Sequence, residues 1–173
     1  MKAVQPFLIG SGWMELKDGD DSVRTIFDRH YSRYHYKDGR TPKLFAGPGF
    51  KIVLMTADAG AICVWRKFIS MDNQDGVSCA VFRRESGPAA SVLLSEAMGI
   101  AWDRWPGERL YTYVDPFGVP PTMRAGRPTW GHCFYQCGWK FAGLTSKRLH
   151  ILEVFQPKQT TGNHQNEITE DWE

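Results

Sequence analysis

Apolar and aromatic positions near the start of the chain recur every three or four residues, as they do on one face of a helix. They are Val23, Ile26, Phe27, His30, Tyr31 and Tyr34. This spacing predicts a helix over residues 23–36, with Ser22 as its N-cap, after a first strand at residues 12–17. Glycine and proline residues interrupt the next stretch, so residues 37–50 are expected to form a loop.

The pattern then changes to short apolar runs separated by polar turns. Runs at residues 51–56, 61–68 and 76–82 predict three consecutive strands, which short turns join into an antiparallel meander. A helix over residues 90–105 and a strand over residues 109–114 follow. A strand–helix–strand unit of this kind adds one parallel pair to the sheet. The expected class is therefore α/β, with a mixed, mostly antiparallel central sheet flanked by helices.

The last third of the chain contains many glycine and proline residues. Residues 115–127 are expected to form a loop, and Pro128 to open a short helix that Gly138 ends. A closing hairpin is predicted at residues 139–143 and 148–155. We therefore expect one domain over residues 1–155. Residues 156–173 are polar and end in acidic side chains, which predicts a disordered tail.

Composition narrows the class of protein only slightly. The 173 residues suit a single domain, and the formal net charge of +2 is too small to identify a partner. No apolar run approaches the length of a membrane span, and residues 1–12 lack a signal-peptide layout, so we expect a cytoplasmic protein without a membrane partner. The four cysteines form no disulfide framework, and His132, Cys133 and Cys137 lack the paired spacing of a metal site.

The junction between the predicted strand 76–82 and the helix 90–105 carries the clearest chemical signal. A helix N-terminus presents unpaired N–H groups and a partial positive charge, and small residues let an anion approach them closely. Two arginines add charge beside this turn. The sequence thus predicts a phosphate site formed by Arg83, Arg84, Gly87, Pro88, Ala89, Ala90 and Ser91.

The pattern Arg84-x-x-Gly87-x-Ala89 resembles the pyrophosphate loop of the GNAT superfamily of N-acetyltransferases. A second resemblance lies in residues 133–139, which are similar to the late helix of that family and the aromatic–glycine–aromatic end of that helix. Together the resemblance covers residues 12–155. It implies that acetyl-CoA is the acyl donor and that its pantetheine arm lies between the strands that end at Phe82 and Val114. Backbone N–H groups of Ala80, Val81 and Phe82 would then polarise the thioester carbonyl.

The chain departs from the family where a tyrosine often protonates the leaving thiolate. Phe134 stands at that position, beside the expected cofactor, and Tyr135 follows one place later, turned by about 100° on a helix. Arg127 stands where many members carry asparagine. The remaining candidates for proton transfer are His30, Tyr113, Asp115 and His132, besides Tyr135. Two alternatives stay open: His30 as a core histidine, and Asp115 as a turn-capping carboxylate.

The expected first helix interleaves cations with aromatic rings. Cations contact phosphates and aromatic faces stack on bases, so this pattern favours a polyanionic acceptor, with DNA first. The expected contacts are Arg29, Tyr31, Arg33, Tyr34, Arg124 and Arg127. An ordinary solvated helix face is the alternative.

His30-Tyr31 and Asp115 also resemble positions in phage-encoded proteins of this fold that modify DNA bases. That resemblance implies an amino group on a DNA base as acceptor, and the cytoplasm of an infected cell as the location. An acetyltransferase for small amines or proteins, and a noncatalytic nucleic-acid-binding protein, stay open as alternatives, as do a monomer and a homodimer.

Overall fold

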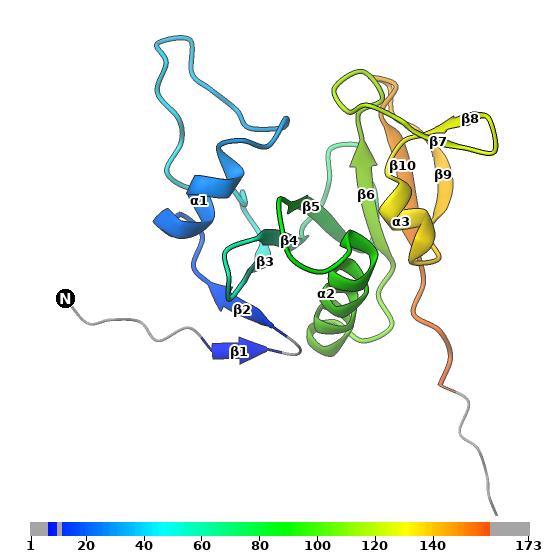
Figure 1. Ribbon diagram of the computed structural model, residues 1–173, viewed down its shortest axis with the longest axis horizontal. Coiled ribbons are helices and arrows are strands. Elements are labelled where there is room, and N and C mark those ends of the chain that lie inside the picture. The colour runs from blue at the N-terminus through cyan, green and yellow to red at the C-terminus, as the bar shows by residue number, and fades with distance from the viewer. Residues whose placement is uncertain (1–6, 10–11, 160–173) are drawn as a thin grey trace, which may run out of the picture.

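The structure is a computed structural model that describes residues 7–9 and 12–159. A large sheet of eight strands runs through it in the order β1-β2-β3-β4-β5-β6-β10-β9 (Figure 1). The elements in chain order are β1 (Phe7–Ile9), β2 (Trp13–Leu16), α1 (Asp21–Phe27), β3 (Phe50–Thr56), β4 (Ala61–Lys67), β5 (Val77–Arg84), α2 (Ala90–Arg104), β6 (Leu110–Val114), β7 (Thr122–Arg124), β8 (Arg127–Thr129), α3 (His132–Gln136), β9 (Lys140–Leu144) and β10 (His150–Val154).

The sheet is mixed and mostly antiparallel, as the sequence predicts. Every neighbouring pair in it is antiparallel except β5 and β6, which are parallel and joined through α2. The predicted meander is β3-β4-β5, and the closing hairpin is β9-β10. The α/β class is thereby confirmed, and so is the single parallel pair.

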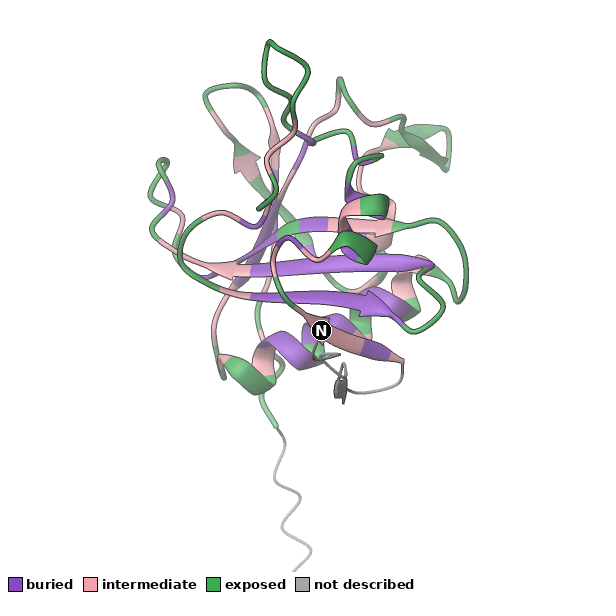
Figure 2. Cartoon of the chain, turned by 90° about the vertical axis from the view of Figure 1, so that its left-hand side faces the viewer, coloured by how far each residue is buried: buried purple, intermediate pink, exposed green. Residues whose placement is uncertain are grey.

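The two faces of the sheet bury two separate cores, because successive side chains of a strand point to opposite faces. Ile52 and Leu54 pack with α2 on one face, whereas Val53 and Met55 pack with α1 on the other. Figure 2 shows the central strands buried along most of their length. Helices on both faces hold the middle of the sheet rigid, which fixes the ends of β5 and β6 where the candidate site lies.

The prediction of a helix over residues 23–36 is wrong in its length. The helix α1 begins after Asp20, whose carboxylate accepts the N–H of Ser22 at 2.9 Å, so Asp20 and not Ser22 is the N-cap. It ends at Phe27. The chain continues in i→i−3 turns, in which the N–H of His30 bonds the Phe27 carbonyl at 2.8 Å. The residues after Phe27 therefore lie on a looped segment and not on a helix face.

Two other expectations need correction. The predicted loop 115–127 holds a strand, β7, that pairs with β8 in a separate two-stranded sheet. Pro128 lies in β8, and the short helix α3 begins only at His132. Residues 155–159 are irregular, and the rest of the predicted disordered tail lies outside the described residues.

Among residues 7–9 and 12–159, no helix has the length and apolar character needed to cross a bilayer.

Candidate active site between β5 and β6

The parallel pair β5–β6 opens into a V after two residues. Pairing joins Val77 to Leu110 and Ser78 to Tyr111 and then stops. The hydroxyl of Thr112 donates to the carbonyl of Cys79 at 2.9 Å and closes the apex of the V. Beyond this bond the two strands diverge, so the edge of β5 toward β6 has no strand partner. We refer to this opening as the V-cleft.

A β-bulge lies on β5 at the apex of the V-cleft. Opposite β4, Val81 pairs with Val64 and Cys79 pairs with Trp65, which leaves Ala80 with no opposite residue. A bulge bends its strand and takes one residue out of the ladder. Ala80 is exposed and lies where the V opens. The bulge thus lies at the point where β5 loses its pairing with β6.

Two adjoining cavities fill the V-cleft and bring many of the predicted residues together. The inner one, about 160 Å³, and the outer one, about 340 Å³, share Tyr31, Cys79, Ala80 and Tyr113 in their walls. Among the predicted site residues, His30, Tyr31, Ala80, Val81, Phe82, Tyr113, Asp115 and Phe134 line one cavity or both. Residues from the segment after α1, from β5 and β6 and from α3 thus meet at one place.

The turn between β5 and α2 is held in place by backbone and side-chain hydrogen bonds. The N–H groups of Glu85 and Ser86 donate to the carbonyl of Gly60 at 2.7 and 3.1 Å. Arg84 folds back so that its guanidinium donates to the carbonyls of Gly87 and Pro88 at 2.8 and 2.6 Å. Its side chain therefore orders this turn, with two of its nitrogens engaged in these bonds.

The N-terminus of α2 is left open. Its N-cap, Ala89, provides no side-chain hydrogen bond, and Val92 and Leu93 both donate to the carbonyl of Ala89. The amides of Ala90 and Ser91 are then the ones without an intrahelical acceptor. A further cavity of about 390 Å³ between α2 and α3 begins at Ser91. An anion bound to these amides would have room for a larger group beside it.

Glu85 joins the turn to the segment after α1. The carboxylate accepts from Arg29 at 2.7 Å and from Arg83 at 2.8 Å. The Arg29 hydrogen bond, followed by that of Arg83, holds the pKa of Glu85 at about 2, well below its usual range. Arg29 and Arg83, predicted to contact substrate and cofactor respectively, are both engaged by this carboxylate. Glu85 lies within the Arg84-x-x-Gly87 pattern, but its partner Arg29 is 56 residues away in the sequence, so the pattern did not reveal the ion pair.

His30 is a buried neutral histidine in the wall of the inner cavity. Its Nδ1 accepts the N–H of Ser32 at 3.2 Å and lies 2.7 Å from the Ser32 hydroxyl. Burial, with the charge of Arg83 adding to it, lowers the pKa of His30 to about 4. The imidazole is therefore uncharged at neutral pH and is a weak base.

Tyr113 and Asp115 lie where β6 ends. The Tyr113 hydroxyl donates to the Asp72 carboxylate at 2.7 Å, and burial together with this bond raises the pKa of the phenol. One oxygen of Asp115 caps the N–H of Phe117 at 2.8 Å. The capping role left open by the sequence is thus present. A methyl group added to Gly118 would lie 2.9 Å from the second oxygen, Oδ2, which has no hydrogen bond from the described residues.

Of the other residues predicted to contact the acceptor, one is buried and holds a loop in place, and two are exposed. Arg33 is buried, pairs with Asp28 at 2.8 Å and donates to the Pro42 carbonyl at 2.7 Å. It therefore holds the loop after α1 in place. Tyr34 is exposed, and Arg127 is exposed in β8. These two remain available to a ligand.

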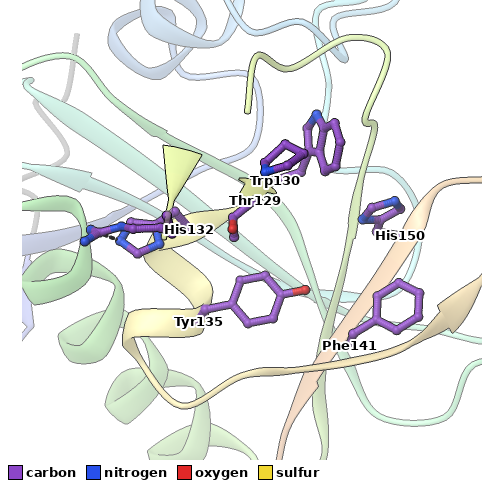
Figure 3. A pocket seen from close by; sticks show the side chains of 8 residues that line it. Thr129, Trp130, His132, Tyr135, Phe141 and His150 are labelled. Carbon is purple, nitrogen blue, oxygen red and sulfur yellow. Dashed lines mark hydrogen bonds between the residues drawn. The ribbon is translucent and has the colours of Figure 1, made fainter. Parts of the chain in front are cut away.

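Phe134 and Tyr135, which are adjacent on α3, line different cavities. Phe134 faces the V-cleft and meets the ring of Phe82 edge-on, with centroids 6.1 Å apart. Tyr135 lines a separate cavity together with His132 and Arg124 (Figure 3). The helix carries no hydroxyl into the V-cleft, where the partly buried thiol of Cys133 lies instead. Burial raises the pKa of this thiol to about 12.

No group of three histidine, cysteine or acidic side chains that could hold a metal ion occurs among the described residues. The Cys137 thiol donates to the carbonyl of Ser91 at 3.1 Å and ties α3 to the start of α2. Sequence reasoning missed this bond and the Thr112 bond, because neither residue belongs to a recognisable motif.

Comparison of the chain with protein-family models, with curated proteins and with solved structures finds no match.

Proposed function

We propose that this chain is an acyl-CoA-dependent N-acyltransferase of the GNAT type, which transfers an acetyl group to an amino group on a base in DNA. The observation that carries the proposal is the V-cleft, opening beside an uncapped helix N-terminus. The strand order β2-β3-β4-β5-β6-β10-β9, with β5 and β6 parallel, also agrees with the fold that the sequence resembles.

The donor has a continuous path along α2 and β5. The amides of Ala90 and Ser91 suit the pyrophosphate, because backbone N–H groups at a helix start bind phosphate oxygens. The cavity between α2 and α3, which begins at Ser91, would take the nucleotide beside these amides. The open edge of β5 offers peptide groups to a pantetheine arm, which would place the thioester near the bulge at Ala80.

The reaction requires attack, proton removal and departure of a thiolate. The acceptor nitrogen attacks the thioester carbon, the carbon–sulfur bond breaks, and the amide forms. We assign the proton of the attacking nitrogen to Asp115, because its Oδ2 is free of hydrogen bonds from the described residues at the wall of the outer cavity. Neutral His30 orients the acceptor instead of removing its proton. The thiolate takes its proton from water, since α3 presents Phe134 there.

The acceptor side combines exposed aromatic rings with cations. Tyr31 and Tyr34 are exposed after α1, and Arg124 and Arg127 are exposed in the β7–β8 hairpin. In Figure 1 these two regions lie at the end of the sheet toward which β6 runs. Rings that stack on bases and cations that contact phosphates favour a nucleic-acid acceptor over a small amine.

Mass spectrometry of nucleosides tests the proposal. Single-stranded DNA is incubated with the protein and acetyl-CoA, digested and compared with DNA treated with the Ala89→Asp variant, whose carboxylate would occupy the phosphate site. The proposal predicts one nucleoside heavier by an acetyl group in the first sample alone. Activity should fall steeply with added salt, because phosphate contacts are screened.

A noncatalytic binding protein is favoured by one observation, the presence of Phe134 in place of a proton donor at the V-cleft. Calorimetric titration with acetyl-CoA followed by single-turnover analysis separates the two functions. Binding of DNA without any acyl transfer, from a protein that also binds acetyl-CoA, would establish the noncatalytic function.

A further inference from the structure

Another cavity, of about 450 Å³, opens between α3 and the β9–β10 hairpin. We call it the aromatic pocket, after the side chains of Trp130, Tyr135, Phe141 and His150 in its wall. The rings of Trp130 and Phe141 both meet His150 edge-on, with centroids 5.6 and 5.4 Å away. In Figure 3 the hydroxyls of Thr129 and Tyr135 point into the space that these rings enclose.

One cation borders this aromatic pocket. The guanidinium of Arg124 donates to Nε2 of His132, and burial and the arginine charge together lower the pKa of that histidine. The positive charge in the wall is therefore carried by Arg124 and not by His132. Aromatic faces, two hydroxyls and one exposed guanidinium match the parts of a nucleotide, namely a flat ring, its polar edge and its phosphate.

The aromatic pocket is separated from the V-cleft by a thin segment. Gly131, Cys133 and Phe134 line the V-cleft, whereas Trp130 and His132, which alternate with them, line the aromatic pocket. A methyl group on Gly131 would lie only 3.0 Å from Val114, so this segment lies close against β6. Two ligands, one in each cavity, would therefore be neighbours across a single stretch of backbone.

We propose that the aromatic pocket binds a nucleotide of single-stranded DNA that adjoins the nucleotide whose base is acylated. Its base stacks within the pocket and its phosphate contacts Arg124. This inference rests on the proposed function, because it extends the acceptor site of the same reaction. The protein would then contact two adjacent nucleotides of one strand. The aromatic pocket would thereby contribute to the sequence preference around the modified base.

Fluorescence anisotropy of a short, fluorescein-labelled single-stranded DNA tests the inference. Trp130→Leu and Phe141→Leu should each weaken binding roughly tenfold, as expected for the loss of one stacked base. Arg124→Gln should weaken binding and reduce the slope of log affinity against log salt by about one. Phe50→Leu and Arg104→Gln are matched controls, because both side chains are exposed on other parts of the molecule.

Calorimetric titration with coenzyme A is the second arm of the test. The inference requires unchanged coenzyme A affinity in Trp130→Leu and Phe141→Leu, together with weaker DNA binding. If coenzyme A affinity falls and DNA affinity does not, the pocket holds the adenine of the coenzyme, and the inference is overturned. Unchanged affinity for both ligands overturns it as well. Failure of the wild-type protein to bind coenzyme A would refute the proposed function, while the DNA arm would still report on the pocket.

The variant Phe141→Leu provides an independent test if Trp130→Leu fails to fold. The Phe141 side chain is 51% exposed on β9, so its replacement removes little from the core. Circular dichroism and melting temperature establish the fold of each variant before binding is measured.

Discussion

Replacing Ala89 with aspartate should make the protein more stable while abolishing coenzyme binding. Ala89 is the N-cap of α2, with φ −55° and ψ 144°, and it provides no side-chain hydrogen bond. Aspartate is among the best N-cap residues in this backbone conformation, because its carboxylate accepts the N–H of the second or third helical residue. Those residues are Ser91 and Val92, at the start of the proposed phosphate site.

The gain in stability should be about 1 kcal/mol, the usual difference between alanine and a good N-cap. For a chain of 173 residues this corresponds to a rise in melting temperature of about 2–4 °C. Against a bound pyrophosphate the same carboxylate is repulsive. Two like charges about 4 Å apart cost about 4 kcal/mol at an effective dielectric constant near 20. Affinity for coenzyme A should therefore fall by more than about 100-fold.

Thermal denaturation and calorimetric titration measure the two effects separately. Ala89→Ser is the matched control, since serine also caps the helix but adds no charge, and it should keep most of the affinity for coenzyme A. The reasoning is refuted if Ala89→Asp binds coenzyme A as tightly as the wild-type protein while showing the expected stabilisation. In that case the N-terminus of α2 is not the phosphate site.

Three further predictions concern the V-cleft and the contacts that support it. Asp115→Asn should lower kcat at least 100-fold with coenzyme A affinity unchanged, because the amide oxygen still caps Phe117 but no longer accepts a proton; steady-state and binding measurements check this. The pKa of Glu85 lies at about 2, below its ordinary value of 4.5, so its contribution to stability is present above pH 4.5 and is lost as the pH falls toward 2. Melting temperatures between pH 5 and pH 3 should accordingly fall less in Glu85→Gln than in the wild-type protein. His30 has its pKa lowered from 6.5 to about 4, so folding is disfavoured progressively as the pH falls from 6.5 toward 4, and His30→Gln should flatten the melting temperature over that range.

The strands β2 to β6, the hairpin β9-β10 and the helix α2 were predictable because local pattern and tertiary structure agree there. The meander β3-β4-β5 follows runs of β-branched and aromatic residues with short polar turns, and α2 follows a long segment without internal proline. The turn between β5 and α2 was predictable for a related reason. A glycine that adopts φ +89° at position 87, between a strand and a helix, is a local requirement and leaves a local signal.

The segment after Phe27 was not predictable from spacing alone. The aromatic stripe continues to Tyr34, but side-chain hydrogen bonds and ion pairs compete with the helix there. Arg29 is drawn to Glu85, and Arg33 is held by Asp28 and by the Pro42 carbonyl. His30 accepts the N–H of Ser32, which a continuous helix would direct elsewhere. These side-chain contacts override periodicity, and the spacing of apolar residues gives no signal for them.

The assignment of side chains to cavities was only partly predictable. A rotation of about 100° per residue on α3 correctly predicts that Phe134 and Tyr135 face different directions. Periodicity does not predict that the aromatic pocket lies on the side of α3 that Tyr135 faces. That cavity depends on Phe141 and His150, which the β9–β10 hairpin brings alongside α3.

A crystal structure of the protein with coenzyme A tests the central claim most directly. The account predicts pyrophosphate oxygens within hydrogen-bond distance of the Ala90 and Ser91 amides, and a pantetheine arm along the open edge of β5 toward the bulge at Ala80. Coenzyme A bound elsewhere, with the V-cleft filled by side chains, would contradict it.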